Sequence, residues 1–191
     1  MSQGDLPLAI WAPARHFPAM LTLLLLRHAK SSWDDISQDD FDRPLTKRGT
    51  KAAPMIGALL LKKALVPDLV LCSTAVRARA TLTLVMNEFD GLTPSVIYDE
   101  ALYMSDAETM LDKIRAVKGQ PAVVMVVGHN PGMHALALEL TGSGPRSGLQ
   151  SLAMQFPTAA LAHITFDVES WRRIAPVMGE LVEFVLPRKL G

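Results

Sequence analysis

The sequence predicts an α/β fold, a three-layer sandwich in which helices cover both faces of a mostly parallel sheet. Short apolar runs of strand length recur along the chain, and segments with helical spacing of apolar residues separate them. Polar residues with chemically useful side chains follow several of these strands. Because the carboxyl ends of parallel strands meet at one edge of a sheet, we expect those residues to share a site there.

The first strand and the helix after it show this pattern most clearly. Residues 21–26 form a continuous apolar run, typical of a strand buried on both faces, and end at an Arg-His pair. After a polar loop, a helix is predicted over residues 47–63, with Thr46 as its N-cap and a kink at Pro54. The chain therefore begins with a strand, a polar loop and a helix.

A second buried strand is predicted at residues 68–72, and the hydroxyl residues Ser73 and Thr74 are expected to cap the helix that follows. The apolar residues of that helix have helical spacing and are expected to face the core: Val76, Ala80, Leu84 and Val85. A second strand and helix pair is the result.

Two further strand and helix pairs are predicted in the middle of the chain. A short strand is expected at residues 95–98, and the spacing of Ser105 and Glu108 has the form of a capping box. A stronger strand at residues 121–127 precedes Asn130-Pro131, which is expected to supply the N-cap and first residue of a helix.

The last quarter of the chain is predicted as a loop followed by strands. Residues 142–151 contain three glycines, a proline and three serines, which is typical of a loop. Strands are expected at residues 161–166 and 181–186. The alternation of strands and helices thus gives way to strands at the end.

Composition limits the possible functions. The 19 basic and 19 acidic residues cancel, so no overall positive field would attract nucleic acid or an anionic membrane, and any anion site must be local. The single cysteine, Cys72, cannot form an intramolecular disulfide and ends an apolar run, which favours a reducing, cytoplasmic compartment. Neither nucleic acid nor a membrane is expected as a partner.

The first 19 residues differ from the rest of the chain. They carry three prolines and only Arg15 as a side chain with a fixed positive charge, which is unlike a secretory signal or an Arg-rich transit peptide. We expect residues 1–19 to be a loose extension, with Met20 as an alternative start, and residues 20–191 to form a single domain.

Four residues at strand ends or helix starts are the candidates for chemistry. Arg27 and His28 follow the first strand, Arg77 lies in the first turn after the second, and His129 follows the strand at residues 121–127. Two guanidinium groups can hold phosphoryl oxygens in bidentate fashion, and nearby helix starts offer free backbone N–H groups. The residues predict a phosphate site.

The motifs around these residues resemble those of the histidine phosphatase superfamily. The segment Leu26-Arg27-His28-Ala29-Lys30-Ser31 is similar to its signature in the branch of SixA phosphohistidine phosphatases. Three further segments resemble family motifs in the same order, and Ala29 and Thr74 depart from common family residues without removing a reacting group: Asp42-Arg43-Pro44-Leu45-Thr46-Lys47-Arg48-Gly49, Ser73-Thr74-Ala75-Val76-Arg77-Ala78 and Gly128-His129-Asn130-Pro131-Gly132.

The resemblance covers roughly residues 21–186 and implies a phosphoglycerate mutase-like fold and a phosphatase mechanism. It implies that His28 attacks phosphorus and carries a transient phosphoryl group, while Arg27, Arg77 and His129 stabilise charge on the phosphoryl oxygens. Water then hydrolyses the phosphohistidine and releases inorganic phosphate. The resemblance implies no cofactor and no metal.

The general acid is a separate question, because a leaving alkoxide needs a proton and a leaving imidazole needs less help. Glu100 is the best candidate by position, since it follows the strand at residues 95–98 where phosphomutase-like relatives place an acidic residue; a solvated loop glutamate is the equal alternative. The other acidic candidates are expected to form a solvated loop: Asp34, Asp35, Asp39, Asp40 and Asp42.

Substrate contacts are predicted at the edges of these motifs. Arg43 and Lys30 are candidates for contact with the substrate, with an ordinary surface role as the alternative, and Asn130 lies at a helix start beside the expected phosphate.

The substrate itself follows less directly from the residues. A short chain without a large lid leaves an open site that can admit a protein surface, which favours phosphohistidine on a protein, such as a phosphotransfer domain. The alternatives are a phosphatase for small phosphate esters and a catalytically inactive module that binds phosphorylated ligands.

Overall fold

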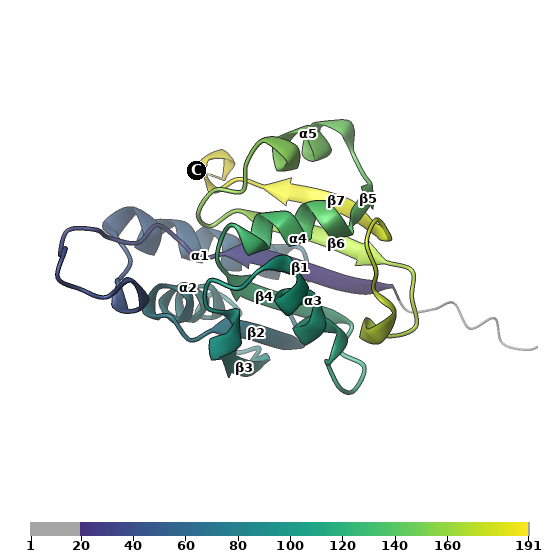
Figure 1. The fold of residues 1–191 in the computed structure, drawn as a ribbon, viewed down its shortest axis with the longest axis horizontal. Coiled ribbons are helices and arrows are strands. Elements are labelled where there is room, and N and C mark those ends of the chain that lie inside the picture. Colours follow the sequence, from purple (N-terminus) through teal and green to yellow (C-terminus); the bar gives the residue numbers. More distant parts are fainter. Residues whose placement is uncertain (1–19, 191) are drawn as a thin grey trace, which may run out of the picture.

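A computed structural model describes residues 20–190 of the chain and shows one seven-stranded sheet, in the order β3-β2-β4-β1-β6-β7-β5 (Figure 1). Among these residues only β6 runs antiparallel to the other strands, so the predicted α/β fold with a mostly parallel sheet is confirmed. The expected extension at residues 1–19 lies outside the described residues. The strands are β1 (Leu21–Arg27), β2 (Leu69–Ser73), β3 (Ser95–Asp99), β4 (Val123–Gly128), β5 (Thr141–Ser143), β6 (Leu161–Phe166) and β7 (Gly179–Val185).

The central strand β1 shows why its apolar run is continuous. Leu21, Leu23 and Leu25 pack into the hydrophobic cluster on one face of the sheet, whereas Leu24 and Leu26 pack into a second cluster on the opposite face. Side chains alternate between the faces of a strand, and here both faces are covered by helices. Every leucine of β1 is therefore buried.

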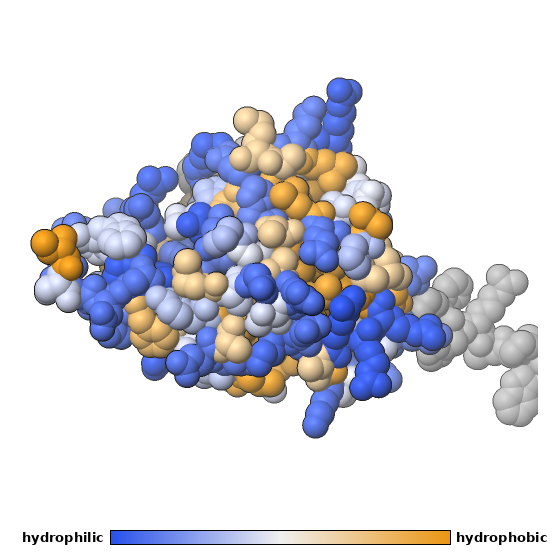
Figure 2. Space-filling model, in the orientation of Figure 1, coloured by the Kyte–Doolittle hydropathy of each residue, from blue (hydrophilic) through white to orange (hydrophobic). Residues whose placement is uncertain are grey.

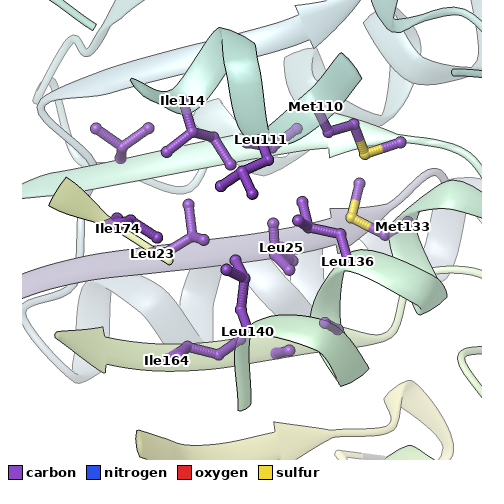
Figure 3. Close-up of a cluster of buried hydrophobic side chains, with 14 of the residues drawn as sticks. Leu23, Leu25, Met110, Leu111, Ile114, Met133, Leu136, Leu140, Ile164 and Ile174 are labelled. Atoms are coloured by element: carbon purple, nitrogen blue, oxygen red, sulfur yellow. The ribbon is translucent and has the colours of Figure 1, made fainter. Parts of the chain in front are cut away.

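One face of the sheet is covered by α3 (Ala107–Arg115), α4 (Gly132–Leu140) and α5 (Arg146–Met154). Figure 3 shows the leucines of β1 meeting side chains from α3 and α4. The side chains that interlock there are Leu23, Leu25, Met110, Leu111, Ile114, Met133, Leu136 and Leu140. This packing fixes α3 and α4 against β1, and with α4 the turn that precedes it.

The other face is covered by α1 (Lys47–Lys62) and α2 (Val76–Met86), which pack against each other. Gly57 allows this close approach, because a Cβ at that position would lie 2.3 Å from the carbonyl oxygen of Val85. The buried face of α2 differs from the predicted one: Val85 is buried, but Arg77 and Thr81 are also buried, whereas the expected core residues Val76, Ala80 and Leu84 are only partly covered. Its inner side includes polar residues because it faces the site described below.

The predicted helix caps are right at α1 and wrong at three other helices. The Thr46 hydroxyl accepts a hydrogen bond from the amide of Gly49, as expected of an N-cap. The helices α2, α3 and α4 begin one or two residues away from their predicted caps. The N-cap of α2 is Ala75, and that of α3 is Asp106 rather than Ser105. Helix α4 begins at Gly132, after Pro131 rather than after Asn130.

The prediction of a loop at residues 142–151 is wrong, because this segment contains part of β5 and most of α5. Its glycines allow close packing. A Cβ on Gly142 would lie 1.9 Å from the carbonyl oxygen of Val177, and one on Gly148 would lie 3.3 Å from Leu181. The small residues that suggested a loop are needed where α5 and β5 approach the neighbouring backbone.

The described residues also contain four single turns of 3-10 helix: η1 (Asp40–Asp42), η2 (Glu100–Leu102), η3 (Trp171–Arg173) and η4 (Pro187–Lys189). Of these, η1 and η2 lie near the carboxyl ends of the parallel strands. Within residues 20–190, none of the helices has the length and apolar character needed to cross a membrane. Figure 2 shows hydrophobic side chains interspersed with hydrophilic ones on the face seen in Figure 1.

Candidate active site

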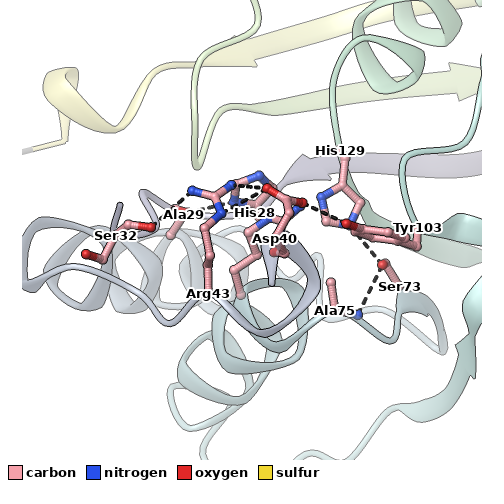
Figure 4. A network of polar contacts seen from close by, with 10 residues as sticks. His28, Ala29, Ser32, Asp40, Arg43, Ser73, Ala75, Tyr103 and His129 are labelled. Carbon is pink, nitrogen blue, oxygen red and sulfur yellow. Dashed lines mark hydrogen bonds and ion pairs between the residues drawn. The ribbon is translucent and has the colours of Figure 1, made fainter. Parts of the chain in front are cut away.

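The four predicted residues come together at the carboxyl edge of the sheet. Arg27 ends β1 beside Gly128 of β4, and the backbone amide of His28 donates to the Gly128 carbonyl at 3.0 Å. His129 follows β4 directly, and Arg77 comes from the first turn of α2 after β2. The rings of His28 and His129 lie 5.0 Å apart between their centroids (Figure 4). Neighbouring parallel strands thus bring distant parts of the sequence to one place.

His28 is held in the state that a nucleophile needs. Its Nδ1 lies 2.7 Å from the carbonyl oxygen of Ala29, which can only accept a hydrogen bond, so Nδ1 carries the hydrogen and Nε2 keeps a lone pair. Burial lowers the pKa of His28 to about 4, against the opposing effect of this hydrogen bond and with added repulsion from Arg77 and Arg27. At neutral pH the imidazole is therefore uncharged.

His129 is also buried and uncharged at neutral pH. Burial, followed by repulsion from His28 and Arg77, lowers the pKa of His129 to about 3. Its Nε2 lies 2.8 Å from the Ser73 hydroxyl, and Tyr103 packs edge-on against its ring. The hydroxyl can donate to Nε2, which leaves Nδ1 free to carry the hydrogen.

Three buried nitrogen atoms at this edge have no hydrogen-bond partner among residues 20–190: Nε of Arg27, Nε of Arg77 and Nδ1 of His129. Burial, together with the positive charge of Arg77, lowers the pKa of Arg27. Buried donors are normally paired, so a group of unpaired ones indicates a site that binds an acceptor-rich ligand. Two guanidinium groups and an imidazole suit a tetrahedral oxyanion.

The backbone around His28 is fixed by neighbouring helices. The Ala29 amide donates to the hydroxyl of Thr81 on α2 at 2.9 Å. The Lys30 carbonyl accepts from the amide of Thr46 at 2.9 Å, and a Cβ on Gly49 would lie 2.2 Å from that same oxygen. The start of α1 therefore packs directly on the loop that carries the histidine.

Asp40 joins the site more closely than the sequence indicated. Its carboxylate accepts from Nη2 of Arg77 at 2.8 Å, from Nε of Arg43 at 2.9 Å and from the Tyr103 hydroxyl at 2.7 Å, and Nη1 of Arg77 donates to its backbone carbonyl (Figure 4). Partial burial opposes ionisation, but the hydrogen bond from Tyr103 and the charges of Arg77 and Arg43 hold the pKa of Asp40 below its usual value. It is an ionised partner of the arginines.

The other predicted residues differ in how far they belong to the site. Arg43 is buried, pairs with Asp40, and has its guanidinium 3.5 Å from the centroid of the Trp33 ring. Asn130 donates from its amide to the Phe156 carbonyl at 2.9 Å, the same oxygen that Arg27 contacts. Both lie beside the candidate phosphate-binding residues, and their contact with a substrate stays a prediction.

Glu100 is exposed in η2, and its carboxylate makes no hydrogen bond or ion pair with any described residue. Its role as general acid stays a prediction. Sequence reasoning missed Ser73 as the partner of His129 and Tyr103 as a partner of Asp40. Ser73 was identified only as a helix cap, and no local pattern links Tyr103 to a residue 63 positions away.

Comparison with known proteins points to the same family that the sequence motifs resemble. The family model of the histidine phosphatase superfamily (branch 1) matches residues 23–103, which include His28, Asp40 and Arg77. An uncharacterised protein of Mycobacterium leprae is 36% identical over 167 residues, which cover 85% of this chain and 100% of that protein.

Solved structures agree. A candidate phosphohistidine phosphatase SixA from Agrobacterium tumefaciens superimposes with a TM-score of 0.73 at 33% identity, covering 87% of this chain and 98% of that one. The protein histidine phosphatase SixA in complex with tungstate has a TM-score of 0.70 at 25% identity, covering 90% and 100%. Since the similarity extends along most of the sequence and of the fold, the chain belongs to the histidine phosphatase superfamily.

Proposed function

We propose that this protein is a phosphatase that transfers a phosphoryl group first to Nε2 of His28 and then to water. The observation that carries the proposal is the state of His28: its hydrogen lies on Nδ1, and a pKa of about 4 keeps Nε2 unprotonated at neutral pH. A neutral imidazole beside two guanidinium groups can attack a bound phosphoryl group.

In the first step the Nε2 lone pair forms a bond to phosphorus, and the bond from phosphorus to the leaving group breaks. The leaving group keeps that electron pair and takes up a proton from solvent water. The unpaired nitrogens of Arg27, Arg77 and His129 would bind the phosphoryl oxygens while charge develops on them. Because these donors are already fixed by Phe156, Asp40 and Ser73, little reorganisation is needed.

In the second step a water oxygen attacks phosphorus, the bond between Nε2 and phosphorus breaks, and inorganic phosphate leaves. Imidazole is a suitable leaving group, and His28 regains its neutral form with its hydrogen still bonded to Ala29. We propose that the reaction needs no metal, because the positive charge required by the phosphoryl oxygens comes from Arg27 and Arg77.

The proposed substrate is phosphohistidine on a protein. Two features support it over a phosphate ester. The carboxylate nearest the histidines, Asp40, is held ionised by arginines and is a poor proton donor, while Glu100 is exposed and unpaired within the described residues. A departing imidazole needs less help from an acid than an alkoxide does. Structural neighbours named SixA at 33% and 25% identity support the same substrate.

The test compares phosphate release from a phosphohistidine protein and from an aryl phosphate, using wild type and His28→Ala. We expect the wild type to release phosphate, to prefer the phosphohistidine protein, and to yield a labelled phosphoenzyme that survives denaturation in alkali. The His28→Ala variant should lose both release and labelling while keeping its circular dichroism spectrum.

An exposed arginine far from the site provides the control: Arg172→Ala in η3 should match the wild type. If wild type releases phosphate from neither substrate, the proposal is wrong and a binding module becomes the better interpretation. A preference for the aryl phosphate would assign small esters as substrates.

A further inference from the structure

A small basic pocket lies beside the candidate active site, on the side of the sheet covered by α1. It has a volume of about 100 Å³, and its walls include Lys30, Arg48 and Arg188 together with the polar side chains of Gln155 and Thr158. Typical sites for whole ligands are larger, roughly 300 Å³ or more. The basic pocket therefore suits one anionic group better than an entire substrate.

The walls of the basic pocket belong to the same segments that build the active site. Lys30 follows His28 by two residues, and its carbonyl is held by Thr46 at the start of α1. Gln155 and Pro157 flank Phe156, whose carbonyl accepts hydrogen bonds from Arg27 and Asn130. A substrate with its phosphoryl group at His28 would thus present neighbouring groups to the basic pocket.

The positive charge of the basic pocket is not balanced locally. Lys30, Arg48 and Arg188 form no ion pair with any residue that the structure describes. Other cations near the same edge are paired, as Arg43 and Arg77 are with Asp40. On a chain with a net charge of zero, such a local excess favours an anionic group.

We infer that the basic pocket is a second anion subsite, which binds an acidic side chain of a phosphoprotein substrate next to its phosphorylated histidine. This inference rests on the proposed function. All three cations are exposed on long side chains, and η4, which carries Arg188, packs beside α1 at the surface (Figure 1). A carboxylate that projects from a protein surface can reach such a pocket without being enclosed.

Two synthetic peptides test the subsite. Both carry one chemically phosphorylated histidine, flanked by glutamates in one peptide and by glutamines in the other. At low salt, wild type should hydrolyse the glutamate peptide with a kcat/KM about 5-fold to 10-fold higher, mostly through KM, and high salt should reduce this ratio. The double variant Arg48→Gln/Arg188→Gln should bring the ratio to between about 1 and 2.

The control variant is Arg172→Gln, which removes an exposed arginine at the opposite edge of the sheet, where Trp171 of η3 contacts Pro121 ahead of β4. It should keep the wild-type ratio. Equal hydrolysis of both peptides by wild type would overturn the second subsite while leaving the phosphatase intact. The assignment to a protein carboxylate would be overturned if wild type preferred a small bisphosphate over its monophosphate but showed no preference between the two peptides.

Binding separates failure of the subsite from failure of the catalytic proposal. Fluorescence anisotropy of the labelled peptides on His28→Ala needs no turnover, and we expect the glutamate peptide to bind about 5-fold more tightly than the glutamine peptide. Loss of that preference in His28→Ala/Arg48→Gln/Arg188→Gln supports the subsite even if wild type proves inactive. Equal binding of the two peptides to His28→Ala contradicts it.

Discussion

The two single turns η1 and η2 both carry acidic residues near the carboxyl edge of the sheet, yet only one supplies a carboxylate to the site. Asp40 of η1 bridges Arg43 and Arg77, whereas Glu100 of η2 is exposed and unpaired within the described residues. The contribution of η2 comes from Tyr103, its C-cap, whose hydroxyl donates to Asp40. An acidic residue that follows a strand is therefore not always the one that pairs with the arginines of the site.

Among the residues around η1 and η2, the largest effect should come from the arginine that Asp40 holds. Arg77→Lys keeps the positive charge but loses the unpaired Nε and the planar guanidinium fork whose two Nη atoms bind Asp40. We expect kcat on a phosphohistidine protein to fall on the order of 10²-fold. Steady-state kinetics measure this, with Arg79→Lys as the matched control, because Arg79 is exposed on the same helix. A loss of less than about threefold would mean that charge alone suffices at this position.

Asp40→Asn should have the next largest effect, because asparagine keeps the size of the side chain but not the charge that fixes Arg77 and Arg43. We expect kcat to fall on the order of 10-fold, as for other residues that orient a reacting group through a hydrogen bond, with a smaller change in KM. Asp42→Asn provides the control, since Asp42 is exposed in the same turn. If the two variants are equally active, Asp40 has no role in the site, and η1 and η2 no longer differ in the way described.

The two buried histidines make stability depend on pH. Their pKa values, about 4 for His28 and about 3 for His129, lie below the usual 6.5, so the unfolded chain binds protons that the folded chain does not. Their contribution to stability is present above pH 6.5 and is lost as pH falls from there, towards about 4 for His28 and about 3 for His129. For each pH unit of acidification within this range, each histidine should lower the free energy of unfolding by about 1.4 kcal/mol.

Urea unfolding between pH 7 and pH 5 measures this slope. The double variant His28→Gln/His129→Gln should reduce the slope and leave the part due to His163, whose pKa burial also lowers. An unchanged slope in the variant would place the responsible groups elsewhere. The lowered pKa of Asp40 acts at lower pH, because the usual value for an aspartate is 3.8. The histidines and the carboxylate of η1 can therefore be separated by pH.

The strands and the candidate site residues at their ends could be predicted because their signals are local. An apolar run such as β1 is a property of consecutive residues, and the strand ends then place Arg27, His28 and His129. The segment of β5 and α5 could not be predicted in the same way, because its glycines meet residues far along the chain. Gly142 lies against the backbone of Val177, and Gly144 and Gly148 lie against Leu181. Those contacts depend on how distant segments pack.

The same difference between local signals and distant contacts explains why the sequence did not single out Asp40 among the acidic residues. The ion pair of Asp40 with Arg77 spans 37 residues, and the bond from Tyr103 spans 63. Neither is visible in the sequence around Asp40, where five aspartates lie close together with similar neighbours. Glu100 was favoured for its place after β3, but a side chain's direction and its charged partners follow only from the folded arrangement.

The smallest effect is expected at Glu100, and it tests the contrast between the two turns from the other side. Because Glu100 has no partner among residues 20–190 and a leaving imidazole needs little help from an acid, Glu100→Gln should change kcat on a phosphohistidine protein by less than about 2-fold. An aryl phosphate with a poor leaving group, assayed in parallel, reveals any hidden role as an acid. The control is Glu108→Gln in α3, which should be unchanged. If Glu100→Gln loses 10-fold or more of its activity on that ester, η2 moves towards the substrate during turnover. The static difference between η1 and η2 would then not decide which carboxylate works.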